Sequence, residues 1–125
     1  MEKIRTHKDL RVYQLAFEVA IKIHEISMSF PVEEKYSLTD QMRRSSRSVC
    51  ANLAESWRKR RYKNHFISKL SDSEAEAAET QVWLDFSLTF KHIDHKTHNE
   101  LYDKYEHILA MLINISITPD NWLIK

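Results

Sequence analysis

The chain has 125 residues, and its 19 lysines and arginines nearly balance 18 aspartates and glutamates, giving a formal net charge of +1. This length fits one domain and excludes a second. The chain has no glycine and two prolines, whereas average usage would supply about nine and six, so a fold rich in tight turns, such as a sheet of hairpins, is excluded.

The N-terminal sequence, MEKIRTHKDL, has no apolar stretch of the kind found in signal peptides. No run elsewhere approaches the roughly 18 apolar residues that a membrane-spanning helix needs. We therefore expect a cytoplasmic protein with no membrane partner. The single cysteine, Cys50, lies within an apolar helical pattern, which favours a buried, unreactive thiol over a nucleophile.

The first two helices are predicted at about residues 8–29 and 38–61, where apolar side chains recur with the helical period. Pro31 ends the first helix, because proline disfavours helical geometry in the residue before it. Ser37 is predicted to cap the second helix, with Asp40 as its partner in a capping-box-like pair.

Two further helices are predicted at about residues 64–92 and 96–117, and Pro119 ends the last. Because the connections between the four segments are short, neighbouring helices must run in opposite directions. The expected architecture is all-α: an antiparallel up-down-up-down four-helix bundle, in a single domain over residues 1–125.

The first, third and fourth helices carry apolar side chains over more than the roughly 100° that faces the core of a lone bundle. The excess on the third and fourth helices would form an exposed patch, and such patches usually mark interfaces. We therefore expect a homo-oligomer. The patch comprises Trp83, Phe86, Phe90, Met111 and Ile113.

The second helix carries a narrow polar seam beside its apolar stripe. We interpret the seam as a close helix contact, in which buried polar groups are hydrogen-bonded to the next helix. The alternative, catalysis by Glu55 as a general acid or base, lacks a second catalytic group placed by the sequence. The seam comprises Gln41, Ser45, Ser48, Asn52 and Glu55.

Charge is distributed unevenly between the second and third helices. Residues 41–63 have a net charge of +7, and residues 64–90 have a net charge of −4. Opposite charges on adjacent helices can pair, and cations suit a helix C-terminus. Five cations within residues 58–63 exceed what one neighbouring helix can neutralise, so some should project into solvent, where they could hold phosphate oxygens. The candidate nucleic-acid-binding residues are Arg43, Arg47, Arg58, Lys59, Arg60, Arg61 and Lys63.

A spaced set of residues runs from the first link into the third helix: Phe30, Pro31, Glu33, Glu34, Tyr36, Leu38, Thr39, Gln41, Arg43, Arg44, Ser48, Val49, Asn52-Leu53-Ala54-Glu55 and Glu79-Thr80-Gln81. This set resembles the signature of the 23S rRNA intervening-sequence protein family. The resemblance implies a small bacterial protein that forms a homopentamer of antiparallel four-helix bundles and has no enzymatic activity. Related bundles are accessory factors of diversity-generating retroelements, and those are also basic pentamers that bind nucleic acid.

One departure from the family pattern bears on the basic cluster. The family usually follows its Asn-x-Ala-Glu run with glycines, and here those positions hold Ser56, Trp57, Arg58 and Lys59. Glycine would break the helix, whereas these residues need not. We therefore expect the basic cluster to lie on an extended last turn of the second helix.

Histidines offer weaker candidates. His92, His95 and His98, with Asp94, have spacing that could bind zinc on a helix, but they fall in a predicted loop, where a solvated surface is favoured. His24 lies on an apolar stripe and is interpreted as a hydrogen-bonded core or interface histidine. No metal or cofactor is therefore expected.

The leading hypothesis is a non-enzymatic bundle that binds nucleic acid, preferably RNA, through a basic patch repeated in an oligomer. Tyr62, His65 and Phe66 could stack on bases beside the patch, although the spacing of Phe66 and Leu70 favours core positions. The alternative is a protein-interaction scaffold, for example for a retroelement reverse transcriptase, with no direct nucleic-acid role. A catalytic carboxylate metal site would need paired Glu-x-x-His motifs, which the sequence lacks.

Overall fold

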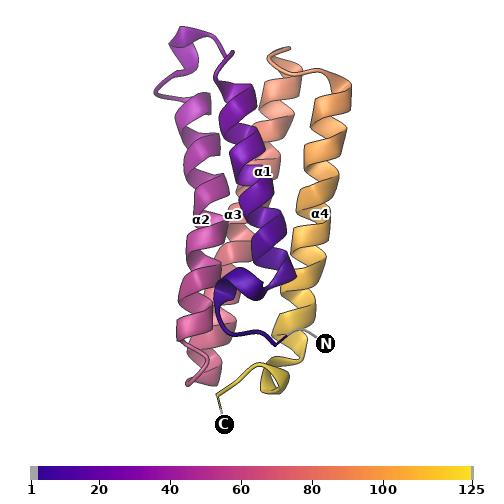
Figure 1. The fold of residues 1–125 in the computed structure, drawn as a ribbon. Helices are drawn as coiled ribbons and strands as arrows, with labels where there is room; N and C mark the ends of the chain where they lie inside the picture. Colours follow the sequence, from indigo (N-terminus) through magenta and orange to yellow (C-terminus); the bar gives the residue numbers. More distant parts are fainter. Residues whose placement is uncertain (1–2, 125) are drawn as a thin grey trace.

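The computed structural model describes residues 3–124, and its four long helices run alternately up and down in an antiparallel bundle (Figure 1). Each helix packs on the next along the chain, and the first also packs on the last. The all-α four-helix bundle predicted from the sequence is therefore confirmed. None of the helices in this part of the chain is long and apolar enough to cross a membrane. The helices are α1 (Arg11–Ser27), α2 (Leu38–Arg58), α3 (Lys63–Thr89) and α4 (His95–Ile117).

The core receives apolar side chains from all four helices. Ile23, Met42, Leu84 and Leu112, one from each helix, are completely buried. Cys50 is also buried, as predicted, and burial raises the pKa of its thiol to about 11, so the sulfur stays protonated at neutral pH.

The polar seam predicted on α2 forms part of its contact with α3. Thr80 Oγ1 donates a hydrogen bond to Ser45 Oγ at 2.8 Å, and Ser73 Oγ donates to the Val49 carbonyl at 2.9 Å. All three hydroxyls belong to buried residues, and small side chains at these positions let the two helices approach closely. Glu55, at the end of the seam, is exposed and pairs with Lys69 at 2.6 Å; this contact holds the pKa of the Glu55 carboxyl below its usual range.

The start of α1 differs from the prediction. A short 3-10 helix, η1 (His7–Asp9), precedes it, and α1 itself begins at Arg11. The Thr6 hydroxyl accepts a hydrogen bond from the Lys8 amide, and the Asp9 carboxylate accepts one from the Thr6 amide. This reciprocal capping arrangement stabilises a separate turn where the sequence pattern predicts continuous helix.

The capping pair predicted at the start of α2 is wrong. Ser37 is the residue before the helix, but its hydroxyl donates to Glu34 Oε1 at 2.7 Å and accepts no helix amide. A second 3-10 helix, η2 (Val32–Glu34), brings the Glu34 carboxylate within reach of this hydroxyl. Ser37 itself has φ of −124° and ψ of −101°, outside the extended geometry from which an N-cap side chain usually accepts helix amides.

The predicted extension of α2 to Arg61 is also wrong. The helix ends at Arg58, and the amide of Lys59 bonds to the carbonyls of Glu55 and Ser56. The Trp57 carbonyl, which a continuing helix would pair with the Arg61 amide, instead accepts from Arg60 Nε at 2.8 Å. A side chain thus competes with the helix for the carbonyl, and the basic cluster continues into a turn that contains no glycine.

The junction of α3 and α4 is made by a lysine in an unusual conformation. Lys91 has φ of 63°, and it is the one residue with positive φ in the described range. The His92 amide bonds to the Ser87 carbonyl at 2.8 Å and the Lys91 amide bonds to the Leu88 carbonyl at 2.9 Å, which is the Schellman arrangement. Because this arrangement ends the helix, α3 stops at Thr89, three residues before the predicted end.

Candidate nucleic-acid interface

The predicted basic residues at the end of α2 lie where α2 turns into α3, at the same end of the bundle as the end of α4 (Figure 1). Two of them hold the C-terminal segment in place. The Arg60 guanidinium stacks on the Trp57 ring at 3.4 Å and donates to the Trp122 carbonyl at 3.3 Å. Lys63 Nζ lies 3.3 Å from Asp120 Oδ1. Partial burial lowers the pKa of Arg60, and both cations have structural partners.

The other three cations at this turn are exposed. Arg58, Lys59 and Arg61 have no carboxylate within ion-pair distance among residues 3–124. Tyr62 follows them, 58% exposed, with its ring centroid 5.6 Å from that of His65. We call these residues the basic corner: Arg58, Lys59, Arg61, Tyr62 and His65.

Phe66, the third aromatic candidate for base stacking, is 2% exposed and belongs to the core, as its spacing with Leu70 favours. Only Tyr62 and His65 of the three rings are therefore accessible beside the cations. The basic corner thus combines three exposed positive charges with two exposed rings, a composition that suits the phosphates and unstacked bases of a single strand.

Arg43 and Arg47 do not join the basic corner. Arg47 precedes Arg58 by eleven residues, which is about 16 Å along a helix with only a small rotation about its axis. Both side chains reach α1: Arg43 Nε donates to Ser27 Oγ at 2.8 Å, and Arg47 Nη2 lies 3.2 Å from His24 Nδ1. The seven candidates therefore form two groups on α2 and the turn after it.

Part of the charge on α2 is neutralised by α3, as the sequence predicts. Arg44 lies 3.4 Å from Glu76 and also pairs with Glu79. Desolvation is the largest influence on Glu76 and raises the pKa of its carboxyl, while Arg44 opposes this shift. The arginine therefore offsets a cost of partly burying these acids against α2.

The prediction that His92, His95 and His98 lie in a loop is wrong for two of them, because α4 begins at His95 and includes His98. The histidines also do not converge on one point. His92 Nε2 lies 3.0 Å from Glu34 Oε2, while His98 Nε2 lies 2.8 Å from Asp85 Oδ1. Within residues 3–124, no group of three or more His, Cys, Asp or Glu side chains could hold a metal ion. His24, interpreted above as a core or interface residue, is exposed at the surface of α1.

The residues of the predicted apolar patch lie on two separate surfaces, one on α3 and one on α4. The rings of Trp83, Phe86 and Phe90 follow one another with centroids 6.0 and 5.8 Å apart. Phe86 lies near the end of α3, whereas Ile113 lies eighteen residues after the start of α4. In antiparallel neighbours this places Ile113 about 20 Å from Phe86 along the bundle. We call the three α3 rings the aromatic patch; Met111 and Ile113 belong to a separate surface.

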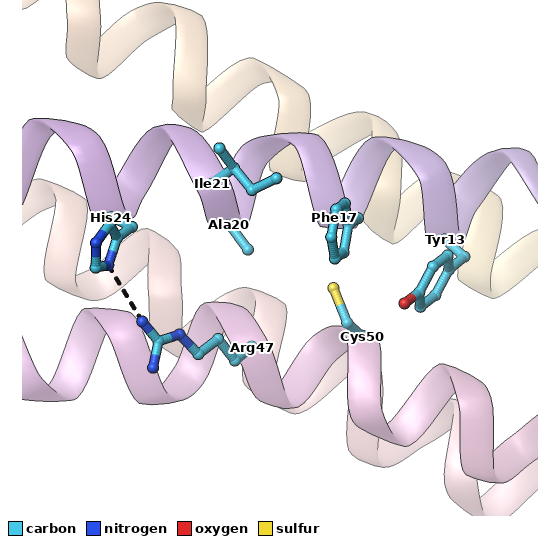
Figure 2. A pocket seen from close by; sticks show the side chains of 7 residues that line it. All are labelled: Tyr13, Phe17, Ala20, Ile21, His24, Arg47 and Cys50. Atoms are coloured by element: carbon cyan, nitrogen blue, oxygen red, sulfur yellow. Dashed lines mark hydrogen bonds between the residues drawn. The ribbon is translucent and has the colours of Figure 1, made fainter. Parts of the chain in front are cut away.

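A groove lies between α1 and α2, and it was not predicted from the sequence. Its volume is about 460 Å³, and Figure 2 shows side chains from both helices around it. The spacing of Tyr13, Phe17 and Ile21, four residues apart, could have indicated it, because it marks an apolar stripe that is not buried in the core. The groove is lined by Tyr13, Phe17, Ala20, Ile21, His24, Arg47 and Cys50.

Comparisons with known proteins agree with this architecture. A family model described as "23S rRNA-intervening sequence protein" matches residues 8–114. No curated protein matches the chain. A solved structure of a protein with unknown function, from the S23 ribosomal protein family of Bacteroides thetaiotaomicron, is 25% identical and superimposes with a TM-score of 0.75. The similarity covers 84% of this chain and 94% of that one.

Proposed function

The protein belongs to the 23S rRNA-intervening sequence protein family, and we propose that it is a non-enzymatic protein that binds nucleic acid, preferably RNA, through the basic corner. The observation that carries the proposal is the exposure of Arg58, Lys59 and Arg61 with no carboxylate within ion-pair distance in the described residues. Arg60 and Lys63, which hold the C-terminal segment, position this surface and do not contact the nucleic acid.

Contacts with phosphate would supply most of the affinity and little sequence selectivity. Tyr62 and His65 add rings on which unstacked bases can lie, which favours single strands over duplexes. The groups available at the basic corner are donors and π-faces, and neither distinguishes one base from another strongly. We therefore expect binding that depends steeply on salt and weakly on sequence.

Self-association would strengthen this binding by presenting several basic corners to one strand. The aromatic patch supports it, because Phe86 and Phe90 are 44% and 53% exposed. The family resemblance implies a homopentamer, and sedimentation of the purified protein measures the number directly. A Phe86→Glu, Phe90→Glu variant is expected to be monomeric.

The decisive experiment measures affinity for a single-stranded RNA as a function of salt. Replacing Arg58, Lys59 and Arg61 by Ala should lower the log-log slope by about 2, at roughly 0.7 per phosphate contact on a single strand. A matched control replaces Lys8, Lys22 and Lys96, which are exposed elsewhere, and leaves both affinity and slope close to those of the wild type. Equal behaviour of the two triple variants would refute the proposal.

The aromatic patch favours a second candidate, a scaffold that docks a protein such as a reverse transcriptase and has no direct nucleic-acid role. Tyr36 borders the patch and is 84% exposed, so the apolar surface extends beyond α3. This candidate predicts a protein partner that remains bound after nuclease treatment and is lost in the Phe86→Glu, Phe90→Glu variant. The basic-corner variant would retain that partner.

A further inference from the structure

We propose that the groove between α1 and α2 binds a small organic anion with an apolar body, of the chemical class of medium-chain or aromatic carboxylates. This site is separate from the basic corner and does not depend on the proposed function. Its volume of about 460 Å³ falls within the range of roughly 300 to 1,000 Å³ that small-molecule sites occupy.

The body of the groove is apolar. Phe17 and Ile21 are 49% and 46% exposed, so each presents apolar surface that the fold itself does not cover. In Figure 2 the Cys50 thiol points toward Phe17, and Ala20 lies between the larger side chains of α1. Because the thiol remains neutral, it adds no charge to this surface. A hydrocarbon chain or an aromatic ring could therefore be removed from water here with few unsatisfied polar groups.

Positive charge is located at one end of the groove. Figure 2 shows Arg47 and His24 joined there, with Arg47 Nη2 3.2 Å from His24 Nδ1. One guanidinium N–H is used in this contact, and a guanidinium has five. Arg47 has no carboxylate within ion-pair distance in residues 3–124. The remaining donors match the geometry of a carboxylate, which guanidinium groups bind in a bidentate manner.

The groups at this end of the groove also determine the sign of the charge that a ligand can carry there. Because a guanidinium can only donate, Arg47 keeps its remaining N–H donors and its positive charge for a ligand and offers it no acceptor. An anion is favoured at this end, whereas an ammonium group of the same size is repelled by Arg47.

The order of groups along α1 determines how the ligand would lie. His24 follows Tyr13 by eleven residues, or about 16 Å along the helix, and the apolar side chains lie between them. An elongated ligand with its carboxylate at Arg47 would therefore place its apolar chain over Phe17 and Ala20, toward Tyr13. Uncharged hydrocarbon alone would leave the remaining N–H donors of the Arg47 guanidinium unmatched by the ligand.

The test uses decanoate, decanol and decyltrimethylammonium below their micellar concentrations, titrated into the full-length protein and followed by amide NMR shifts. We expect decanoate to bind at least tenfold more tightly than the other two, with the largest shifts at residues 13–24 and 47–50. Arg47→Gln should reduce decanoate affinity about tenfold and leave decanol unchanged. Arg58→Gln, an exposed arginine further along the same helix, is the matched control and should change neither.

Equal binding of decanoate and decanol, shifts located outside the groove, or equal effects of the two arginine variants would overturn the proposal. A second variant, Ala20→Trp, should fill the groove and abolish decanoate binding, and circular dichroism with thermal unfolding verifies its fold. If sedimentation instead shows that Ala20→Trp dissociates an oligomer, the groove is covered by a second copy and the small-ligand proposal fails. RNA binding, measured in parallel, is expected to be the same in the wild type, Arg47→Gln and Ala20→Trp.

Discussion

The two sides of α2 meet their neighbours in different ways. Toward α3, Ser45 lies against Thr80 at hydrogen-bonding distance, and Arg44 pairs with Glu76 and Glu79. Toward α1, a groove remains open, and within residues 3–124 the side chain of Arg47 contacts His24 and no carboxylate at ion-pair distance. Toward α3, small polar side chains permit close approach and ion pairs neutralise part of the charge. Toward α1, larger side chains such as Phe17 are half exposed and leave surface available for binding.

The largest difference in stability should come from enlarging one alanine on the α3 side of α2 and one on the α1 side. Ala77 on α3 is completely buried, so Ala77→Leu would overpack the core and destabilise the fold by about 3 kcal/mol. Ala20→Leu, in the groove, has room for the added atoms and should change the free energy of unfolding by less than about 0.5 kcal/mol. Urea unfolding of both variants measures the difference. Equal losses would show that the two sides are packed alike.

Among the cations after α2, the contrast is between side chains that have partners within residues 3–124 and side chains that have none there. Arg60→Ala would remove the stacking on Trp57 and the hydrogen bonds to the carbonyls of Trp57 and Trp122. These contacts together contribute about 2 kcal/mol, so stability should fall by that amount. Arg61→Ala, one residue away and exposed, should cost less than about 0.5 kcal/mol.

Hydrogen exchange locates the effect of the arginine variants. Loss of Arg60 should accelerate exchange at residues 119–124, because this side chain holds that segment against the turn after α2. Loss of Arg61 should leave exchange there unchanged while weakening RNA binding. If both variants affected stability and binding equally, the division of the basic residues into structural and free groups would be wrong.

A further comparison concerns the backbone conformation of two lysines that follow helices, Lys91 after α3 and Lys59 after α2. Lys91 occupies the left-handed region with φ of 63°, which costs a residue with a Cβ roughly 1 kcal/mol relative to glycine. Lys91→Gly should therefore stabilise the protein by about 0.5 to 1 kcal/mol. Lys59, at the end of α2, has φ of −94°, so Lys59→Gly should give no gain. Thermal unfolding of the two variants is the measurement, and a gain at both positions would contradict it.

The fold could be predicted from the sequence because apolar periodicity and the lack of glycine act over whole helices. Some helix ends lie where the sequence predicts them, such as the start of α2 at Leu38 and the end of α4 at Ile117. The ends of α2 and α3 do not, because local contacts that the sequence pattern does not show accompany them: Arg60 donates to the Trp57 carbonyl where α2 ends, and Lys91 adopts positive φ where α3 ends. The candidate site was predicted as one set of cations for the same reason: the residue types are evident in the sequence, but the tertiary contacts that occupy Arg60 and Lys63 are not.

The smallest expected effect concerns a carboxylate that has partners. Glu34 accepts a hydrogen bond from Ser37 and pairs with His92. Both contacts lower the pKa of its carboxyl, and the contact with Ser37 is the larger cause. Since its pKa is lower in the folded than in the unfolded chain, its contribution to stability is present above the unfolded value of about 4.3. This contribution is lost as the pH falls through the folded value.

Glu34→Gln should therefore destabilise the protein at pH 7 by less than about 1 kcal/mol, and the difference from the wild type should shrink toward pH 3. Glu33→Gln is the matched control, since Glu33 is adjacent, exposed and without a side-chain hydrogen bond in the described residues. In urea unfolding, the difference in free energy of unfolding between Glu33→Gln and the wild type should not change across the same pH range. A flat difference at Glu34 would mean that the contacts with Ser37 and His92 do not favour the ionised carboxylate.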